Sequence, residues 1–482
     1  MKNIEDKHFQ ADWQGKDFYL LAKIIAREGG RAMLVGGCVR DELMGRKPKD
    51  WDLEVYGIKP ERLKQLLDDF SQRERLPLNT VGEIFTVYKL GSHLDVSIPR
   101  RERKSGRGHR AFIVEGDPEM SFEEACLRRD FTINAILLDP LSGEIVDPFD
   151  GRKDIEKRVI RHVSEKTFPE DSLRVLRAAQ LASRFEFEID PETISLCKAI
   201  DLTDLPAERI FGEVEKILLL SEKPSIGFGR LYELGVVEKL FPELAALKGV
   251  PQEPDWHPEG DVDVHTLMVL DEARKLIDDL DHARKLTVMI AALCHDLGKP
   301  STTQLIDGRI RSRGHDEAGV EPTISLLDRL GIYTKNGFNV RQQVVELVRY
   351  HLLPGEWYKS KTPVGDGAFR RLARKVEPDL LYRVAKADSL GRNPDWLPEE
   401  KRFGSEAQEW FIGRVRELKI EKAAPKPILQ GRHLIEMGLE PSPKFGKILS
   451  RIYEMQLDGE ISDLEDAKKQ AQRMLNNADK SV

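Results

Sequence analysis

The hydrophobic pattern of this 482-residue chain changes once, and that change constrains its fold more than any other feature. Between residues 18 and 140, short strand-type runs such as AMLVGG, WDLEVYG and HLDVSIP alternate with helix-type patterns. After DPFDG at 147–151, strand-type runs almost vanish, and apolar residues recur every three or four positions. The sequence therefore predicts an α+β head built on a small mixed sheet with helices, followed by all-α segments.

Two proline-rich stretches divide the helical part. GVPQEPDWHPEG separates a first helical block from a second block that holds most of the histidines, and APKPILQGRH opens a charged helical tail. We therefore expect four segments: a head over 18–141, a neck over 142–250, a second helical domain over 251–400 and a helical tail over 401–482.

Composition excludes several classes of protein. Lys and Arg number 76 against 83 Asp and Glu, a net charge of −7, so binding of nucleic acid through bulk charge is excluded and any basic function must be local. The four cysteines lie far apart without a C-x-x-C pair, which argues against a disulfide scaffold and fits a reducing compartment. No apolar run approaches 18 residues, so we expect a soluble, cytoplasmic protein with no membrane partner. The sequence implies no protein partner.

A glycine pair, Gly36-Gly37, follows the first strand-type run and precedes a helix-like segment. Glycines at such a turn let backbone N–H groups approach phosphate oxygens closely, and Arg40 could add a bidentate contact. The alternative is an ordinary tight turn with a surface arginine.

Two carboxylates, Asp50 and Asp52, follow in a strand-type run, and their spacing sends both out of one face. Carboxylate oxygens at this spacing suit Mg²⁺, and Asp95 offers a third carboxylate in the run HLDVS. Three converging carboxylates can hold two Mg²⁺ ions, one for an attacking hydroxyl and one for leaving pyrophosphate. The alternative is an exposed acidic strand face without a ligand; the glycine pair upstream argues against that alternative.

These motifs and three later ones resemble the nucleotidyltransferase superfamily that contains class II CCA-adding tRNA nucleotidyltransferases and bacterial poly(A) polymerases. G-G-x-V-R-D and D-x-D are followed by LRRDFTINA at 127–135, E-D-x-x-R-x-x-R at 170–177 and Glu208-Arg209. The resemblance implies a nucleotidyltransferase fold for the head. It also implies that Arg129 contacts the nucleotide and that Asp130 and Asn134 shape the sugar pocket.

The E-D-x-x-R-x-x-R motif contains Asp171, Arg174 and Arg177. On a helix Asp171 and Arg174 would be i, i+3 neighbours, and a plain surface ion pair is the simplest interpretation. The resemblance implies instead that the pair reads the Watson–Crick edge of incoming CTP or ATP, and that the neck binds RNA. Gln180 stands where some members of the family carry a further arginine.

Six Lys and Arg residues lie within 100–110, together with two glycines. A solvated loop and a phosphate-contacting loop are both compatible with this composition. The resemblance implies a loop that helps to switch selection from C to A.

Histidines and aspartates form an ordered pattern in the second helical block: His265, the adjacent pair His295-Asp296, His315, His351 and Asp388. Mixed imidazole and carboxylate ligands suit a transition metal such as Ni²⁺ or Mn²⁺ better than Mg²⁺. The order resembles the H…HD…D signature of the HD phosphohydrolase superfamily. That resemblance implies His265, His295, Asp296 and Asp388 as core ligands, with His315 and His351 for a second metal or the substrate phosphate. The alternative is a decayed domain kept for packing or tRNA contact.

The sequence thus predicts template-independent addition of CCA to tRNA 3′ ends from CTP and ATP, with Mg²⁺ in the head and a metal-dependent phosphohydrolase in the HD domain. A poly(A) polymerase, or an enzyme that adds only CC or only A, shares the head motifs and stays open. Rivals of other classes are a nucleotide or cyclic-phosphate hydrolase with an RNA-binding head and a non-enzymatic RNA chaperone. Basic residues of the tail could contact tRNA: Lys444, Lys447 and Arg451.

Overall fold

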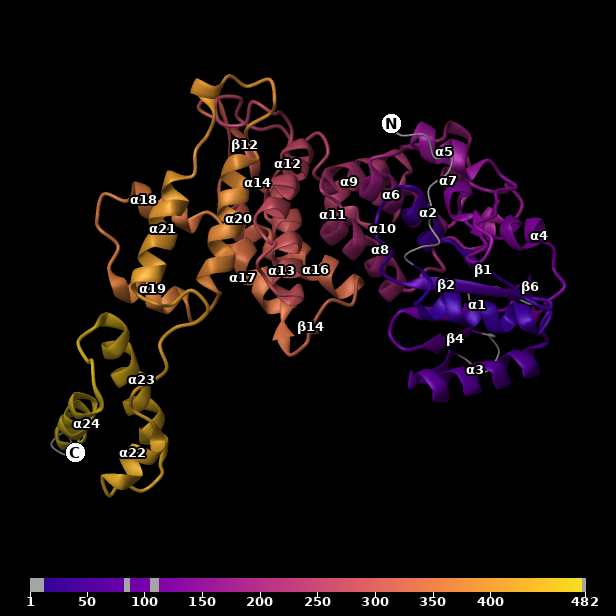
Figure 1. Ribbon diagram of the computed structural model, residues 1–482. Coiled ribbons are helices and arrows are strands. Elements are labelled where there is room, and N and C mark those ends of the chain that lie inside the picture. The colour runs from indigo at the N-terminus through magenta and orange to yellow at the C-terminus, as the bar shows by residue number, and fades with distance from the viewer. Residues whose placement is uncertain (1–12, 82–86, 105–111, 479–482) are drawn as a thin grey trace. The chain divides into compact units, whose positions relative to one another are not determined.

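The computed structural model describes residues 13–81, 87–104 and 112–478 of the chain (Figure 1). Contacts divide it into two units, one comprising residues up to 217 with 226–240 and the other comprising 218–225 with 241–482. The predicted boundaries near 142 and 400 fall inside these units and stay predictions. All four cysteines are buried free thiols, as expected without a disulfide scaffold.

The first unit is built on a seven-stranded sheet with the strand order β3-β4-β5-β2-β1-β8-β9. Strands β2 and β5 are parallel and the other neighbouring pairs are antiparallel, so the predicted mixed sheet is confirmed. The strands are β1 Arg31–Val35, β2 Trp51–Tyr56, β3 Leu78–Val81, β4 Val87–Leu90, β5 Leu94–Ser97, β8 Leu137–Leu138 and β9 Ile145–Val146.

Alternation along β2 decides which side chains the sheet presents. Trp51, Leu53 and Val55 are buried, whereas Asp52 and Glu54 are only partly buried and share the other face. Further elements of the head are α1 Asp17–Arg27, α2 Gly37–Leu43, α3 Pro60–Glu74, α4 Phe122–Leu127, the 3₁₀ turn η1 Thr132–Asn134 and the hairpin of β6 Arg100–Lys104 with β7 Phe112–Gly116.

The rest of the first unit is mainly helical, as predicted. Its elements are α5 Gly151–Lys157, η2 Phe168–Glu170, α6 Arg174–Phe185, α7 Pro191–Ala199, α8 Ala207–Leu220, α9 Pro224–Glu233, α10 Val236–Leu240 and the short parallel pair β10 Val159–Ile160 and β11 Glu188–Ile189.

The second unit packs helices around α13 His282–Cys294, which is buried along most of its length. Its neighbours are α12 Val262–Lys275, α17 Val340–Tyr350 and α20 Pro378–Leu390. Shorter or peripheral helices are α11 Pro242–Ala245, α14 Lys299–Thr302, α15 His315–Ala318, α16 Val320–Arg329, α18 Leu353–Lys359, α19 Asp366–Leu372, η3 Glu399–Lys401 and α21 Glu406–Glu417.

Two small hairpins in this unit were not predicted: β12 Thr303–Ile306 with β13 Arg309–Ser312, and β14 Thr334–Lys335 with β15 Phe338–Asn339. Their turns are Asp307-Gly308 and Asn336-Gly337, and all four turn residues have positive φ. Asp-Gly and Asn-Gly are the preferred pairs of two-residue hairpin turns, so the signal was present but too short to alter the helical period around it.

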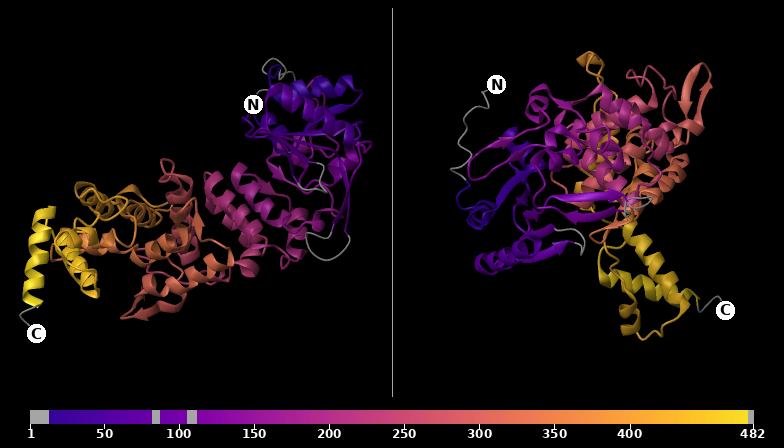
Figure 2. Two further views of the ribbon diagram at one scale, coloured as in Figure 1. Left: turned by 90° about the horizontal axis from the view of Figure 1, so that it is seen from below. Right: turned by 90° about the vertical axis from the view of Figure 1, so that its right-hand side faces the viewer.

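Residues 431–478, the last part of the predicted tail, fold as three helices around a core of their own: α22 Gly431–Glu436, α23 Pro443–Asp458 and α24 Leu464–Ala478 (Figure 2). Arg371 on α19 pairs with Glu454 and Asp458 on α23, at 2.8 and 2.6 Å. Among the described residues, none of the helices combines the length and the apolar character that crossing a membrane requires.

Candidate active sites

The turn between β1 and α2 requires glycine at position 36. Gly36 has φ +72°, and a Cβ there would lie 3.2 Å from Nη1 of Arg129 and 3.9 Å from Oδ2 of Asp52. The absence of a side chain thus lets the β1–α2 turn, Arg129 and Asp52 approach one another. Three of the predicted site residues meet at this point.

Asp52 and Asp95 are direct neighbours across the parallel pair β2–β5. Burial raises the pKa of Asp52 to about 6; Arg129 opposes this rise, and the charges of Asp95 and of the exposed Asp50 add to it. A divalent cation bound here would offset the repulsion among these carboxylates, so the residues fit the Mg²⁺ that the sequence implied. Asp50 lies one residue before β2 rather than within it.

Glu54 is a head residue that sequence reasoning missed. It lies two residues beyond Asp52 on the same face of β2, and its Oε1 is 3.6 Å from Nη2 of Arg129. The alternation W-D-L-E-V contained this signal, because Glu54 continues the period that joined Asp50 to Asp52.

A chain of buried polar contacts links the remaining head residues. Arg177 donates from Nε to Oδ2 of Asp130 at 2.7 Å, and Asp130 Oδ1 accepts from Nδ2 of Asn134 at 3.0 Å. Arg40, only 4% exposed, donates to Oδ1 of Asn134 at 2.6 Å and to Oδ1 of Asp41. A phosphate contact by Arg40 stays a prediction that this geometry does not favour, because its guanidinium already serves protein partners.

The prediction that Asp171 and Arg174 lie on one helix is wrong. Helix α6 begins at Arg174, whereas Asp171 has extended backbone angles and its Oδ2 lies 3.0 Å from Nη2 of Arg209. Arg174 instead donates to the carbonyl oxygens of Thr167 and Arg128 at 2.7 and 2.5 Å. The long-range pair with Arg209, 38 residues away, could not be read from local spacing. The prediction of a basic loop over 100–110 is wrong for residues 100–104, which form strand β6, and residues 105–110 lie outside the described part of the chain.

The second unit gathers every predicted HD residue into one buried cluster. His265 comes from α12, His295 and Asp296 follow α13, His315 begins α15, His351 follows α17 and Asp388 lies on α20. Gly298 allows the approach of α15, because a Cβ at that position would lie 2.0 Å from the carbonyl oxygen of His315.

Asp296 is at the centre of this cluster. Its Oδ2 lies 3.1 Å from Nε2 of His295 and 3.8 Å from Nε2 of His265, while its Oδ1 lies 3.3 Å from Nε2 of His315. His265 Nε2 lies 3.1 Å from Oδ1 of Asp388, and the Nε2 atoms of His315 and His351 are 3.3 Å apart. The two carboxylate oxygens of Asp296 therefore face two different groups of imidazoles, each able to hold a metal ion.

Backbone carbonyls orient three of the imidazoles. The Nδ1 atoms of His295, His315 and His351 lie 2.8, 2.7 and 2.6 Å from the carbonyl oxygens of Ala292, Ser312 and Val348, each three residues upstream. Two of these carbonyls belong to the last turns of α13 and α17, where helix geometry leaves them without an intrahelical partner. With its proton on Nδ1, each ring turns Nε2 towards the cluster, as metal-ligating histidines do.

The cluster has the properties of a metal site. Among the described residues, Nε2 of His295 and both carboxylate oxygens of Asp296 are buried without a hydrogen bond of good geometry. Burial, together with His315 and His295, lowers the pKa of His351 to about 4, so its imidazole is neutral at pH 7. Neutral Nε2 atoms and carboxylates are the donors that transition metals prefer.

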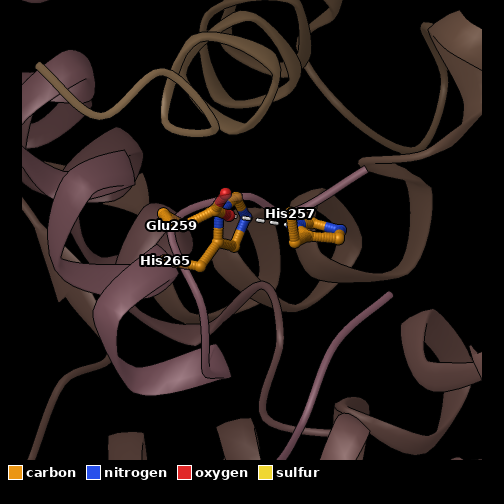
Figure 3. Close-up of side chains that lie close together, drawn as sticks. All are labelled: His257, Glu259 and His265. Carbon is orange, nitrogen blue, oxygen red and sulfur yellow. Dashed lines mark hydrogen bonds and ion pairs between the residues drawn. The ribbon is translucent and has the colours of Figure 1, made fainter. Parts of the chain in front are cut away.

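Glu259 was also missed by sequence reasoning. Its Oε1 hydrogen-bonds to Nδ1 of His257 at 2.9 Å and lies at an ion-pair distance of 2.8 Å from Nδ1 of His265 (Figure 3). Burial would raise the pKa of Glu259, but the bonds to His257 and His265 lower it to about 2. A carboxylate this close to Nδ1 of His265 favours the proton on that nitrogen, which leaves Nε2 for a metal. The run HPEG before α12 carried the signal.

A cavity of about 270 Å³ opens onto the metal-site cluster. It is lined by Asp296, His315, His351 and Asp388 of the cluster and by His257, Lys299, Leu352, Gly355, Glu356, Lys359, Arg392 and Gln408. Lys299 Nζ lies 2.7 Å from Oδ2 of Asp296, so a fixed ammonium stands beside the ligands. Because the cavity opens onto four residues of the cluster, a substrate can reach the metal ligands through it.

Three family models match consecutive parts of the chain. They are the "Poly A polymerase head domain" over residues 32–161, the "Probable RNA and SrmB-binding site of polymerase A" over 186–248 and the "HD domain" over 262–393. The last range contains all six predicted HD residues.

Solved structures share the fold. A CCA-adding enzyme of Bacillus stearothermophilus in complex with CTP matches with a TM-score of 0.61 and 21% identity, covering 98% of this chain and all of that chain. A Thermotoga maritima CCA-adding enzyme complexed with tRNA matches with a TM-score of 0.55 and 21% identity, covering 95% and 94%. The predicted fold class, an α+β head followed by helical segments, is confirmed.

Curated relatives are similar over most of the chain. The multifunctional CCA protein of Mannheimia succiniciproducens is 40% identical over 371 residues, which cover 74% of this chain and 84% of that protein. That of Xanthomonas campestris pv. campestris is 40% identical over 382 residues, covering 76% and 87%. The resemblance drawn from the motifs is thereby confirmed, and the chain belongs to the multifunctional CCA protein family.

Proposed function

We propose that this protein is a CCA tRNA nucleotidyltransferase that adds CCA to tRNA 3′ ends from CTP and ATP, and that its HD domain is a phosphohydrolase. The observation that carries the first activity is the facing pair Asp52 and Asp95 beside Gly36 and Arg129, in a chain 40% identical to multifunctional CCA proteins. Because tRNA, CTP and ATP are cytoplasmic, we place the enzyme in the cytoplasm.

In the head, Asp52 and Asp95 would hold Mg²⁺, with Asp50 at the exposed edge of the site. Bound Mg²⁺ would activate the tRNA 3′-hydroxyl and stabilise the pyrophosphate leaving group. Arg129, whose guanidinium lies beside Glu54 and near Gly36, would contact the nucleotide. Backbone N–H groups at Gly36 and Gly37 would add uncharged donors.

Base selection is assigned to Arg174 with Asp171. Two donors of Arg174 are held by backbone carbonyls, which orients its guanidinium plane before the nucleotide arrives. Arg209 orients Asp171 in the same way. A preorganised donor and acceptor can bind the edges of cytosine and adenine and leave uracil or guanine with an unpaired group, which is costly in a buried site.

The test of the first activity is incubation with tRNA that ends at the discriminator base, together with each labelled NTP, followed by sequencing of the products. We expect addition of C, C and A; a poly(A) tail, CC alone or A alone would replace the proposal by that activity.

Asp52→Asn should abolish addition while tRNA binding and thermal stability persist. Addition above a few per cent of the wild-type rate would contradict the role of Asp52.

The test of base selection is Arg174→Ala, with Arg174→Lys as the partner variant. We expect the alanine variant to incorporate UTP and GTP more often relative to CTP and ATP, as well as to react more slowly. Lysine restores the positive charge but not the planar guanidinium group with its paired N–H donors. The lysine variant should therefore recover the reaction rate better than the base selectivity. A slower but equally selective alanine variant would mean that Arg174 has only a structural role.

In the HD domain, His265, His295, Asp296 and Asp388 would form the core metal site, with His315 and His351 completing a second site on Asp296. A transition metal bound there, Ni²⁺ or Mn²⁺, would polarise water and the phosphoester. Lys299 neutralises charge beside Asp296 and faces the cavity through which a phosphate would enter. Release of phosphate from 2′-nucleotides, or opening of 2′,3′-cyclic phosphates, in the presence of each metal tests this activity. No hydrolysis with any metal would contradict it.

A further inference from the structure

A second cavity of about 290 Å³ adjoins the metal-site cavity. Five residues line both: His257, Lys299, His315, Lys359 and Arg392. The remaining lining residues are Gln252, Glu253, Trp256, Ile310 and Ser312. A molecule held at the metal ligands could therefore extend into the second cavity.

One wall of the second cavity is aromatic. The Trp256 side chain is 51% exposed, and its ring centroid lies 6.4 Å from that of Phe403. Lys359 Nζ lies 5.9 Å from the centre of the Trp256 ring, and the guanidinium carbon of Arg392 lies 4.5 Å from the centre of the Phe403 ring. A half-exposed indole with a cation nearby is a surface on which a flat aromatic group stacks.

The junction of the two cavities is cationic. Lys299 contacts Asp296 and Oε1 of Gln252, each 2.7 Å from its ammonium. Lys359 and Arg392 also line both cavities. Glu253, the carboxylate of the second cavity, accepts the backbone N–H of Ile310. Positive charge at the junction and an aromatic wall beyond it match a phosphate joined to a nucleobase.

We propose that the second cavity is the nucleoside subsite of the HD domain, in which Trp256 stacks on the base of a nucleotide whose phosphoester lies at the junction. This inference rests on the proposed phosphohydrolase activity and assigns one residue of that site, Trp256, to binding of the base. In the reaction, water oxygen bonds to phosphorus, the bond from phosphorus to the ribose oxygen breaks, and a proton of the water ends on the released ribose hydroxyl.

Kinetics of two monoesters test the subsite in the full-length protein loaded with Ni²⁺ or Mn²⁺. Adenosine 2′-monophosphate carries a base, whereas glycerol 2-phosphate does not, and both are followed by phosphate release. Trp256→Ala should lower the ratio of kcat/KM for the nucleotide to that for the glycerol ester at least about fivefold, mainly through KM. Trp256→Phe should retain most of the ratio, because phenyl also stacks.

Trp396→Ala is the matched control, because Trp396 is 67% exposed in the same unit and lines neither cavity. It should leave the ratio unchanged. An unchanged ratio in Trp256→Ala, or an equal fall in Trp396→Ala, would overturn the subsite.

A binding measurement separates the subsite from hydrolysis. Equilibrium dialysis of adenosine 2′-monophosphate, in EDTA and in an Asp52→Asn background, should show affinity at least about fivefold weaker for Trp256→Ala than for Trp396→Ala. A weaker affinity of this size supports the subsite even if the wild-type protein hydrolyses no substrate. Absence of hydrolysis would overturn only the proposed phosphohydrolase activity. Equal affinities with intact hydrolysis would overturn only the subsite.

Discussion

Asp130 carries a buried charge that contacts Arg177 of α6 and Asn134 of η1. Burial raises its pKa, but the charge of Arg177 and hydrogen bonds from Asn134, Arg177 and the Phe131 backbone lower it to about 2, against an ordinary 3.8. Because the pKa in the folded state is lower than in the unfolded chain, ionised Asp130 stabilises the fold above about pH 4. That contribution is lost as the pH falls from about 4 to about 2.

Asp130→Asn should therefore lower the free energy of unfolding of the head at pH 7 by at least about 2 kcal/mol, since each pKa unit corresponds to about 1.4 kcal/mol. The difference from wild type should shrink as the pH falls below 4, because wild-type Asp130 then becomes neutral too. Hydrogen exchange of the β1 and β2 amides measures the stability of this unit separately. Asp69→Asn, an exposed change on α3, should have little effect; a difference independent of pH would contradict the ion pair.

Replacement of Glu259 should lower the affinity of the HD cluster for metal. Glu259→Gln removes the charge that favours the proton of His265 on Nδ1, and loss of such a supporting contact lowers metal affinity roughly 10- to 100-fold. Competition dialysis of Mn²⁺ or Ni²⁺ measures this without any enzymatic assay. Glu317→Gln, at a carboxylate whose side chain is 69% exposed and which pairs with Arg349, is the control and should bind metal as wild type does. Unchanged affinity in Glu259→Gln would exclude a supporting role.

At the scale of elements, the hairpin β6–β7 allows a defined deletion. Lys104 and Phe112 are the last paired residues of its strands, so a two-residue Asn-Gly turn can replace residues 105–111 and close the hairpin. The replacement removes the basic residues Arg107 and Arg110. We expect it to spare addition of C and to impair the terminal A, because the resemblance assigns this segment to the switch in base choice.

The measurement for the hairpin variant is the ratio of products ending in CC to those ending in CCA, at several ATP concentrations. The thermal midpoint of the variant serves as the control for folding. An equal loss of C and A addition would point to general phosphate contact instead.

At the scale of the whole molecule, the two proposed activities use ligands from different units. Asp52 and Asp95 belong to the first unit, whereas His265, His295, Asp296 and Asp388 belong to the second. The head offers oxygen ligands and the HD cluster offers imidazole, so the two sites should also differ in metal preference.

The double variant His295→Ala/Asp296→Ala should therefore lose phosphohydrolase activity with Ni²⁺ or Mn²⁺ and keep CCA addition with Mg²⁺ nearly intact. Asp52→Asn is the reciprocal control and should keep hydrolysis. A tRNA end blocked by a 2′,3′-cyclic phosphate offers no 3′-hydroxyl, so wild type should extend it and the double variant should not. Loss of CCA addition on an unblocked tRNA in the double variant would contradict the separation.

The sequence by itself determined the class of each segment and the order of the motifs. Both follow from local information: the change of period after residue 151 separates the sheet of the head from the mainly helical remainder, and alternation in W-D-L-E-V assigns Asp52 to a face. The six HD residues could be predicted as a group because their order resembles the H…HD…D signature, and their residue types indicated a transition metal.

Only the tertiary structure decided which side chains are partners. Arg40 bonds Asn134, 94 residues away, Asp171 pairs with Arg209 rather than acting from the same helix as Arg174, and Glu259 lies beside two imidazoles. Local periodicity predicts the direction in which a side chain points from its own helix or strand. It does not predict which residue, distant in sequence, lies against that side chain in the folded protein. A buried charge must find its partner there, because leaving it unpaired costs several kcal/mol.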